Sequence, residues 1–341
     1  MGRLSIIIDN GVFRPTMDSD NAVLNRYREY FGKINEELDK ALSSRVALVK
    51  DIGNHSLLGH GKRLRPLFFV LSCQLCNYEG EDTYHLSTIF EYVHAASLLH
   101  DDVLDNAETR RRKPSANQVW GNQAAVLEGD FLYSKASGIA VEANNQAFFK
   151  RLTETTTQMT EAQILELTLT NNWNISKKEY LEIITGKTAV LMSAACACGA
   201  IIAGAEEWAV DSLSQFGINM GVAFQLTDDL LDYTSSERVF GKPVGKDLRE
   251  GKITLPLIYT LAKLEDSERK RIEALFMHQR ATEKDYQDVI KLVCSNEIID
   301  QIRSEAHEYV DKAARSLSSF PDSTVKRNLL ELNQYIIERN Y

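Results

Sequence analysis

The chain has 341 residues, with 48 acidic side chains against 39 basic ones, a formal net charge of −9 and a pI near 5.4. Nucleic-acid-binding proteins usually present a basic face, so this balance argues against nucleic acid as a partner. Five cysteines, an odd number in a chain of this length, favour a reduced, cytoplasmic location over a disulfide framework.

The small number of helix-breaking residues predicts one domain of long helices. Only six prolines interrupt the chain, no Gly-, Ser- or Pro-rich linker divides it, and strand patterns find little support. We therefore expect an all-α fold. Residues 1–20, which are unlike a presequence, are predicted to form an N-terminal arm of open role, and residues 21–341 a single helical domain.

Apolar residues recur at helical spacing along most of the chain. Residues 21–48 show this spacing first, the glycine-containing stretch 51–61 breaks it, and a helix resumes near Leu64. A helix at 85–105 is followed by a basic, helix-breaking loop at 110–114 and by a helix from about Ala116. Further helices are predicted at 123–142, 146–170, 177–204, 208–232, 253–264, 266–278, 282–293, 295–317 and 323–338.

The run 189–205, rich in Ala, Cys, Gly and Ile, is the one stretch that resembles a membrane span. It is shorter than the roughly 20 residues that a bilayer requires, and it consists largely of small residues. A buried core helix is the better interpretation, and we expect no transmembrane segment.

An acidic pentad occurs twice, as Asp-Asp-Val-Leu-Asp at 101–105 and Asp-Asp-Leu-Leu-Asp at 228–232. Residues four apart lie one turn above each other on a helix, so Asp101 pairs with Asp105 and Asp228 with Asp232. In the first helix His94 and Ser97 precede this pair on the same face, and in the second Gln225 does. Hard carboxylate oxygens in such pairs suit Mg²⁺.

A single acidic pair is more often a solvated helix face than a ligand site. Here both copies are embedded in apolar sequence, where so much negative charge requires compensating cations. Basic runs at 61–66, 110–113, 241–247 and 251–252 flank the pentads. Each run alone could be a solvated loop, but together they favour a diphosphate ligand, because arginine forks match phosphate oxygens.

From about residue 25 to its end, the sequence resembles the all-trans polyprenyl diphosphate synthases. The resemblance rests on an ordered set of motifs: Lys62–Pro66 (GGKRxRP in the family), His100–Asp105 with Arg110 and Arg111, Ala125–Leu132 (AVLxGDxL), Gly186–Ala189 (GKTA), Phe224–Tyr233 (FQxxDDxLDY) and Lys252–Pro256. Two positions depart from the pattern, since His60 and Arg112 stand where the family usually has glycine. Neither departure removes a ligand.

This resemblance implies the isoprenoid synthase fold, with helices packed around a deep apolar cavity, and it implies roles for individual residues. Metal ligands would be Asp101, Asp105, Asp228 and Asp232, which would bind several Mg²⁺ ions, replaceable by Mn²⁺. Allylic diphosphate would be held by Arg110, Lys187, Thr188, Gln225, Lys242 and Lys252, and isopentenyl diphosphate by Lys62, Arg65, His94 and Arg111. The catalytic set would be Asp101, Asp105, Lys187, Gln225 and Asp228.

The implied reaction joins an allylic diphosphate to successive isopentenyl diphosphate units. Pyrophosphate leaves, the double bond of isopentenyl diphosphate attacks the allylic cation, and a proton is lost. The resemblance also implies a homodimer, and the product would be delivered to membrane enzymes.

Small residues below the first pentad predict a long product. Ala96 and Ser97 lie five and four positions before Asp101, about 6 to 7.5 Å down the helix axis. Short-chain synthases tend to place an aromatic residue there. We therefore expect an octaprenyl-type product for quinone side chains, and the rival interpretation is that the small residues simply pack against a neighbouring helix.

Four alternatives stay open at this point. A farnesyl or geranylgeranyl diphosphate synthase would stop at a shorter product, and a non-catalytic regulatory subunit would keep the fold without turnover. A class I terpene cyclase is opposed by the second pentad and by the cluster at Lys62 and Arg65. A plain helical scaffold would bind neither Mg²⁺ nor a diphosphate. The preferred allylic primer and the downstream pathway are also open.

Overall fold

The computed structural model describes residues 21–57, 61–110, 113–234, 244–277 and 280–338, and within these ranges the fold is almost entirely helical. The first half contains α1 (Asn21–Asn25), α2 (Arg28–Ala41), α3 (Ala47–Ser56), α4 (Leu64–Leu75), α5 (Thr83–Leu104), β1 (Thr109–Arg110), β2 (Lys113–Pro114), α6 (Ala116–Trp120), α7 (Asn122–Glu142) and α8 (Gln146–Leu169). The second half contains α9 (Lys177–Ile184), the π-helical turn η1 (Thr185–Ala189), α10 (Val190–Ile202), α11 (Glu207–Thr234), α13 (Lys246–Arg249), α14 (Leu255–Lys263), α15 (Asp266–Met277), α16 (Glu283–Val293), α17 (Asn296–Ser316) and α18 (Thr324–Glu338).

The predicted all-α class and most of the predicted helices are confirmed, with three local differences. Residues 51–56 belong to α3, so the break predicted at 51–61 is wrong for that part and holds for residues 57 and 61, and the chain also leaves the helix between Ala41 and Ala47. The basic loop contains a two-residue antiparallel ladder that pairs Thr109 with Pro114. The single helix predicted at 177–204 passes through a π-helical turn.

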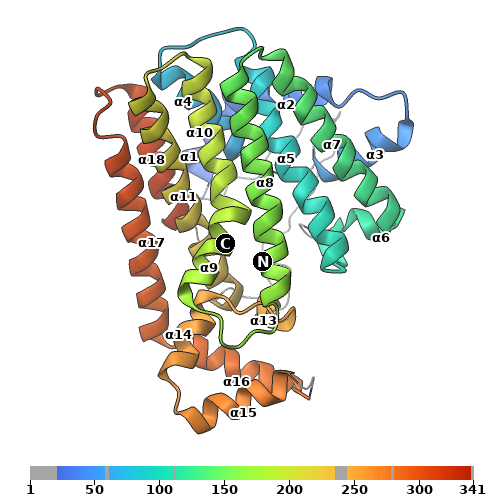
Figure 1. The fold of residues 1–341 in the computed structure, drawn as a ribbon, viewed down its shortest axis with the longest axis vertical. Coiled ribbons are helices and arrows are strands. Elements are labelled where there is room, and N and C mark those ends of the chain that lie inside the picture. Colours follow the sequence, from blue (N-terminus) through green and yellow to red (C-terminus); the bar gives the residue numbers. More distant parts are fainter. Residues whose placement is uncertain (1–20, 58–60, 111–112, 235–243, 278–279, 339–341) are drawn as a thin grey trace, which may run out of the picture.

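The long helices pack as a bundle around α10 (Figure 1). In that view α8 and α10 run through the middle, with α5 and α7 on one side and α11, α17 and α18 on the other. Every residue of α10 from Val190 to Ala200 is buried, as expected for a helix surrounded by others. A second hydrophobic cluster joins α9 and the lower part of α11 to α14–α17.

One helical run of the described chain, Lys177–Ile202, is long and apolar enough to cross a membrane. However, 83% of its apolar window is buried inside the structure. The prediction that this stretch forms a core helix is confirmed.

Glycines in α11 allow the backbones of neighbouring helices to approach closely. A Cβ atom added at Gly217 would lie 2.5 Å from the Cα of Ser193, and one added at Gly221 would lie 2.5 Å from the Cα of Ala189. Both distances are too short for a real Cβ atom, so these positions cannot accept alanine unless α11 moves away from α10 and η1. This contact fixes α11, which carries the second acidic pentad, against the π-helical turn.

We expect Gly217→Ala to lower the free energy of unfolding by roughly 1–3 kcal/mol, because the added methyl group overpacks a rigid backbone contact. Gly138→Ala is the matched control, since Gly138 lies in α7 and a Cβ there would meet nothing within 4 Å. The control should stabilise the protein by about 0.5–1 kcal/mol through helix propensity. Urea unfolding followed by circular dichroism measures both effects, and equal effects of the two variants would contradict the close packing.

Candidate functional site

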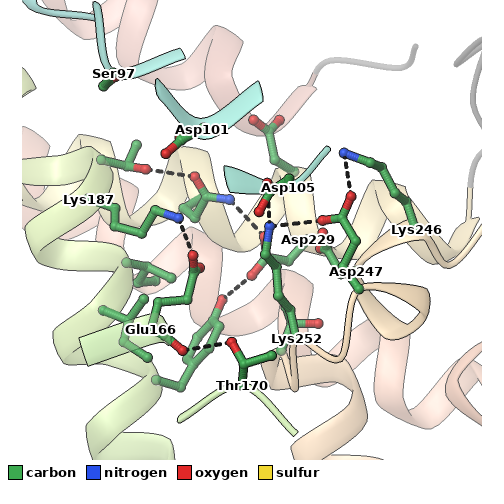
Figure 2. Close-up of a pocket in the computed structure, with 18 of the residues that line it drawn as sticks. Ser97, Asp101, Asp105, Glu166, Thr170, Lys187, Asp229, Lys246, Asp247 and Lys252 are labelled. Atoms are coloured by element: carbon green, nitrogen blue, oxygen red, sulfur yellow. Dashed lines mark hydrogen bonds and ion pairs between the residues drawn. The ribbon is translucent and has the colours of Figure 1, made fainter. Parts of the chain in front are cut away.

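A cavity of about 570 Å³ opens between α5, α8, α9, η1, α11 and the segment around α13. Its lining combines acids, lysines and apolar side chains, several of which are labelled in Figure 2. Of the residues predicted from the sequence to form the site, these line it: Arg65, His94, Ser97, Asp101, Asp105, Arg110, Lys187, Thr188, Gln225, Asp228 and Lys252. Two predicted residues, Arg111 and Lys242, lie outside the described part of the chain.

Helix α5 supplies the first acidic wall. Its residues His94, Ser97 and Asp101, and Asp105 directly after its end, follow one another at spacings of three, four and four, so they share the face that lines the cavity. Burial raises the pKa of Asp101, the nearby Lys187 ammonium opposes this effect, and the Asp105 carboxylate adds to it. Two acids held this closely in a partly dry site favour a bound cation.

The π-helical turn supplies the cationic group that faces this wall. A Cβ at Gly186 would overlap the Cβ of Ala162 in α8. On the other side of the turn, Ala189 packs directly against Gly221 of α11, so the turn lies in close contact with both helices. Such turns often occur at functional sites because they change the phase of a helix. Here Lys187 and Thr188 line the cavity, and Lys187 forms a short ion pair with Glu166 (Figure 2).

Helix α11 supplies the second acidic wall, and its acids differ in their surroundings. Asp228 lines the cavity. Asp229 also borders it but is 4% exposed, and its two oxygens accept hydrogen bonds from Tyr180 and Gln225 at 2.6 and 2.7 Å. Burial raises the pKa of Asp229 to about 7 despite these two hydrogen bonds.

Asp232 does not line the cavity, although it was predicted to be a metal ligand. Its carboxylate accepts the backbone N–H groups of Lys246 and Asp247 at 3.2 and 3.1 Å, and its own carbonyl accepts the N–H of Gly245. Asp232 therefore joins α11 to the start of α13. Burial raises its pKa, and the two N–H donors oppose that effect.

The segment from α13 to Lys252 brings further charged groups to the cavity. Lys252 Nζ lies 2.8 Å from oxygens of both Asp105 and Glu250. Although burial lowers the pKa of Lys252, the carboxylates of Glu166, Asp105 and Glu250 outweigh it and raise the pKa above its ordinary value. The ammonium group therefore stays charged and bridges the α5 wall to the α13 segment.

Charged residues that were not selected from the sequence also line the site: Glu166, Asp229, Lys246, Asp247 and Glu250. Asp229 stands inside the second pentad, and Lys246 and Asp247 stand in the basic run 241–247, so a sequence signal existed for these three. Glu166 and Glu250 follow no motif. Their place in the site depends on how α8 and α13 pack.

The basic cluster before α4 is fixed by a buried ion pair. Arg63 adopts φ +49° immediately before the helix, and its guanidinium donates to Glu91 at 2.5 Å, to Asn35 at 3.1 Å and to the carbonyl of Leu57. Glu91 lies one turn before His94 on α5. The ion pair thus holds the segment 61–65 against α5, where Arg65 and His94 line the cavity. Lys62 does not line it, and its Nζ lies 5.6 Å from the centre of the Tyr335 ring.

Arg110 is placed by the middle acid of the first pentad. Asp102 is 3% exposed, and one of its oxygens accepts both Nε and Nη2 of Arg110, at 2.9 and 2.5 Å. This contact holds Arg110 at the cavity, which its side chain lines. Farther along the loop, Ser115 donates to the carbonyl of Ala107, which closes the loop around Arg110.

The two residues predicted to limit product length face different ways. Ser97 lines the cavity. Ala96 is fully buried in the main hydrophobic cluster and is not among the lining residues. Consecutive helical side chains point about 100° apart, so only one of the two can share the face of Asp101.

The donor set of the site fits Mg²⁺ only together with a bound anion. In the part of the chain that the structure describes, no group of three or more His, Cys, Asp or Glu side chains is close enough to hold a metal ion alone. Mg²⁺ commonly uses one or two carboxylates and completes its shell with water and substrate phosphates. The Asp101–Asp105 pair and Asp228, on separate helices of one cavity, suit that arrangement.

The fold and the site define an all-helical protein in which acidic and basic side chains from several helices line one cavity, and comparison with known proteins specifies the family. The family model described as polyprenyl synthetase matches residues 46–293. The chain is 33% identical to octaprenyl diphosphate synthase of Haemophilus influenzae, over 91% of this chain and 94% of that one. It is 32% identical to heptaprenyl diphosphate synthase component 2 of Geobacillus stearothermophilus, over 90% and 95%.

Among solved structures, the polyprenyl synthase of Caulobacter crescentus CB15, complexed with calcium and isoprenyl diphosphate, superposes with a TM-score of 0.89. It is 33% identical to this chain, and the match covers 96% of this chain and 99% of that one. The chain belongs to the polyprenyl synthetase family and has the isoprenoid synthase fold. It is a prenyltransferase of the trans-prenyl diphosphate synthase type, and its relatives are named for products of different lengths.

The Arg63–Glu91 pair generates a stability prediction, since its side chains are only 4% and 6% exposed. We expect Arg63→Ala or Glu91→Ala alone to cost about 3–5 kcal/mol, because each leaves a buried charge unpaired. The double variant should cost clearly less than the sum of the two. Removing the exposed Lys33–Glu29 pair is the control and should change the free energy of unfolding far less than either single variant of the buried pair. Denaturant unfolding of all variants tests this, and additive costs for Arg63 and Glu91 would contradict it.

Proposed function

We propose that this chain condenses an allylic diphosphate with successive isopentenyl diphosphate units, in a Mg²⁺-dependent reaction, to a long all-trans polyprenyl diphosphate. The observation that carries this proposal is that acids from α5 and α11 and several basic side chains line one cavity together with apolar side chains. The solved Caulobacter structure, which contains calcium and isoprenyl diphosphate, supports the same ligand chemistry.

In this proposal the cations divide between two diphosphates. Arg110, Lys187 and Lys252 hold the allylic diphosphate, together with Lys242, while Arg65 and His94 hold isopentenyl diphosphate, together with Lys62 and Arg111. Bound Mg²⁺ would neutralise the charge that develops on the leaving pyrophosphate. Its ligands would be Asp101, Asp105 and Asp228, and Asp232 would act by holding α13 in place.

The chain's own residues then protect and direct the reaction. The allylic carbon–oxygen bond breaks, and the π electrons of isopentenyl diphosphate form the new carbon–carbon bond. A proton leaves the resulting cation, with pyrophosphate as the acceptor. Apolar side chains such as Leu98, Ile183, Ile184 and Phe224 exclude water that would convert the cation to an alcohol.

The metal requirement is tested with the acids that line the cavity. We expect Asp101→Asn and Asp228→Asn each to lower kcat at least 100-fold and to raise the Mg²⁺ concentration needed for half-maximal activity, because each removes a charged ligand. Glu154→Gln is the control, since this acid lies on the exposed surface of α8 and should not change either value. Isothermal titration with Mg²⁺ and an allylic diphosphate analogue measures binding directly, and heat that persists unchanged in both variants would argue against metal ligation.

Product length is the finer part of the proposal, and the small residue that lines the cavity supports a long product. We expect Ser97→Phe to shorten the product, because an aromatic ring would fill the cavity one turn below Asp101. Ala96→Phe should instead reduce stability, since Ala96 is fully buried in the core. Chromatography of radiolabelled products measures chain length. An unchanged distribution of chain lengths for Ser97→Phe would show that residue 97 does not limit product length.

An octaprenyl product for quinone side chains, made in the cytoplasm and passed to membrane enzymes, remains the specific form of the proposal. A farnesyl- or geranylgeranyl-length product is the alternative that the same chromatography would reveal. The relative named component 2 supports keeping a second alternative, in which the chain works only with a different subunit. Turnover by the purified chain alone would exclude that alternative.

A homodimer is proposed as well. Large apolar side chains on α7 and α8 are more than half exposed, namely Leu127, Val141, Ile164 and Leu167, and a second copy of the chain would cover them. Light scattering should give twice the chain mass, and a monomeric mass at micromolar concentration would contradict the proposal.

A further inference from the structure

Four side chains beside the cavity form one continuous series of hydrogen bonds. Tyr180 donates its phenolic O–H to one oxygen of Asp229 at 2.6 Å, and Gln225 donates its amide N–H to the other at 2.7 Å. Thr188 donates its hydroxyl to the amide oxygen of Gln225 at 2.8 Å. The series joins α9, α11 and η1, all four of its members line the cavity, and Asp229 is labelled in Figure 2.

The direction of each hydrogen bond in this series follows from Asp229, which accepts two of them. Tyr180 and Gln225 each donate to a different oxygen of Asp229, so the group of Gln225 that faces Asp229 is its NH₂ group. The amide oxygen of Gln225 is then turned toward Thr188, which must donate its single hydroxyl proton. The threonine oxygen is left with lone pairs alone on its remaining side.

We propose that Asp229 and Tyr180 are positioning residues, which set this proton order so that Thr188 and Gln225 present only acceptor oxygens to the cavity. This inference rests on the proposed function, in which an allylic cation forms beside these oxygens. Fixed negative dipole ends next to a developing positive charge stabilise it without reorganisation during the reaction. Asp229, unlike its neighbour Asp228, therefore acts through Gln225 and not as a metal ligand.

Loss of the Asp229 carboxylate should allow the hydrogen bonds of the series to reverse their direction. In Asp229→Asn the side-chain amide can donate to Gln225, which allows the Gln225 amide to rotate and turn its NH₂ group toward Thr188. Thr188 would then accept, and its proton would point toward the cavity, where it opposes a cation. The shape of the site would hardly change, so substrate binding should be preserved.

The test compares Asp229→Asn with the exchanged pair Gln225→Glu/Asp229→Asn in the full-length enzyme. In the pair, the carboxylate introduced at position 225 accepts both from the amide introduced at position 229 and from Thr188, so the order at Thr188 and the total charge are restored. We expect Asp229→Asn to lower kcat roughly 10- to 100-fold, with little change in KM for either substrate and no change in the Mg²⁺ concentration for half-maximal activity. The exchanged pair should regain most of the kcat that Asp229→Asn loses. If Asp229→Asn lowers kcat about 100-fold, the kcat of the pair should be at least ten-fold higher than that of Asp229→Asn.

Tyr180→Phe provides a second measurement if Asp229→Asn does not fold. It removes one bond to Asp229 and keeps the bond to Gln225, so kcat should fall a few-fold with both KM values unchanged. Unchanged kcat in the folded single variants, an increased Mg²⁺ requirement in Asp229→Asn, or no recovery in the exchanged pair would each overturn the inference. If the wild-type chain forms no prenyl product, the proposed function fails instead, so the two failures are distinguishable.

Discussion

Repulsion among carboxylates that share one cavity is the constraint on which the site depends. Asp101 in α5, Asp105 at its C-terminal end, Glu166 on α8 and Glu250 beside α13 all line this one cavity, where their negative charges repel one another. Lys187 and Lys252 form ion pairs that connect these elements. In the proposed reaction the same two lysines hold a diphosphate, because ammonium groups pair with phosphate oxygens as they do with carboxylates.

Several residues of the diphosphate-site motifs serve the scaffold that carries the ligand-binding groups. Asp102 orients Arg110, Asp232 fixes the start of α13, and Arg63 with Glu91 secures the segment before α4. Each of these groups is buried and satisfied by specific donors or acceptors. Their loss would therefore disturb the site through its geometry, and a loss of activity in such variants is not by itself evidence of substrate contact.

Close backbone contacts position the reactive groups as much as charges do. Gly186 and Gly221 allow η1 to lie between α8 and α11, and this places Lys187 and Thr188 opposite the first acidic wall. Gly129 in α7 has a similar role beside α5, because a Cβ there would overlap the ring of His100, the residue before Asp101. The glycines of the motifs thus determine where neighbouring side chains point.

Helical spacing alone determined much of this protein: the all-α class, nearly every long helix, and the common face of His94, Ser97, Asp101 and Asp105. These are local properties, since 3.6 residues per turn set which side chains share a face. The same phase rule separates Ser97, which shares the face of Asp101, from Ala96, which does not. Tertiary packing alone decided that Asp232 accepts backbone N–H groups of α13, that Glu166 faces Lys187 and that Lys62 lies near Tyr335. Those contacts join residues 14 to 273 positions apart, and no local pattern in a single sequence encodes such distances.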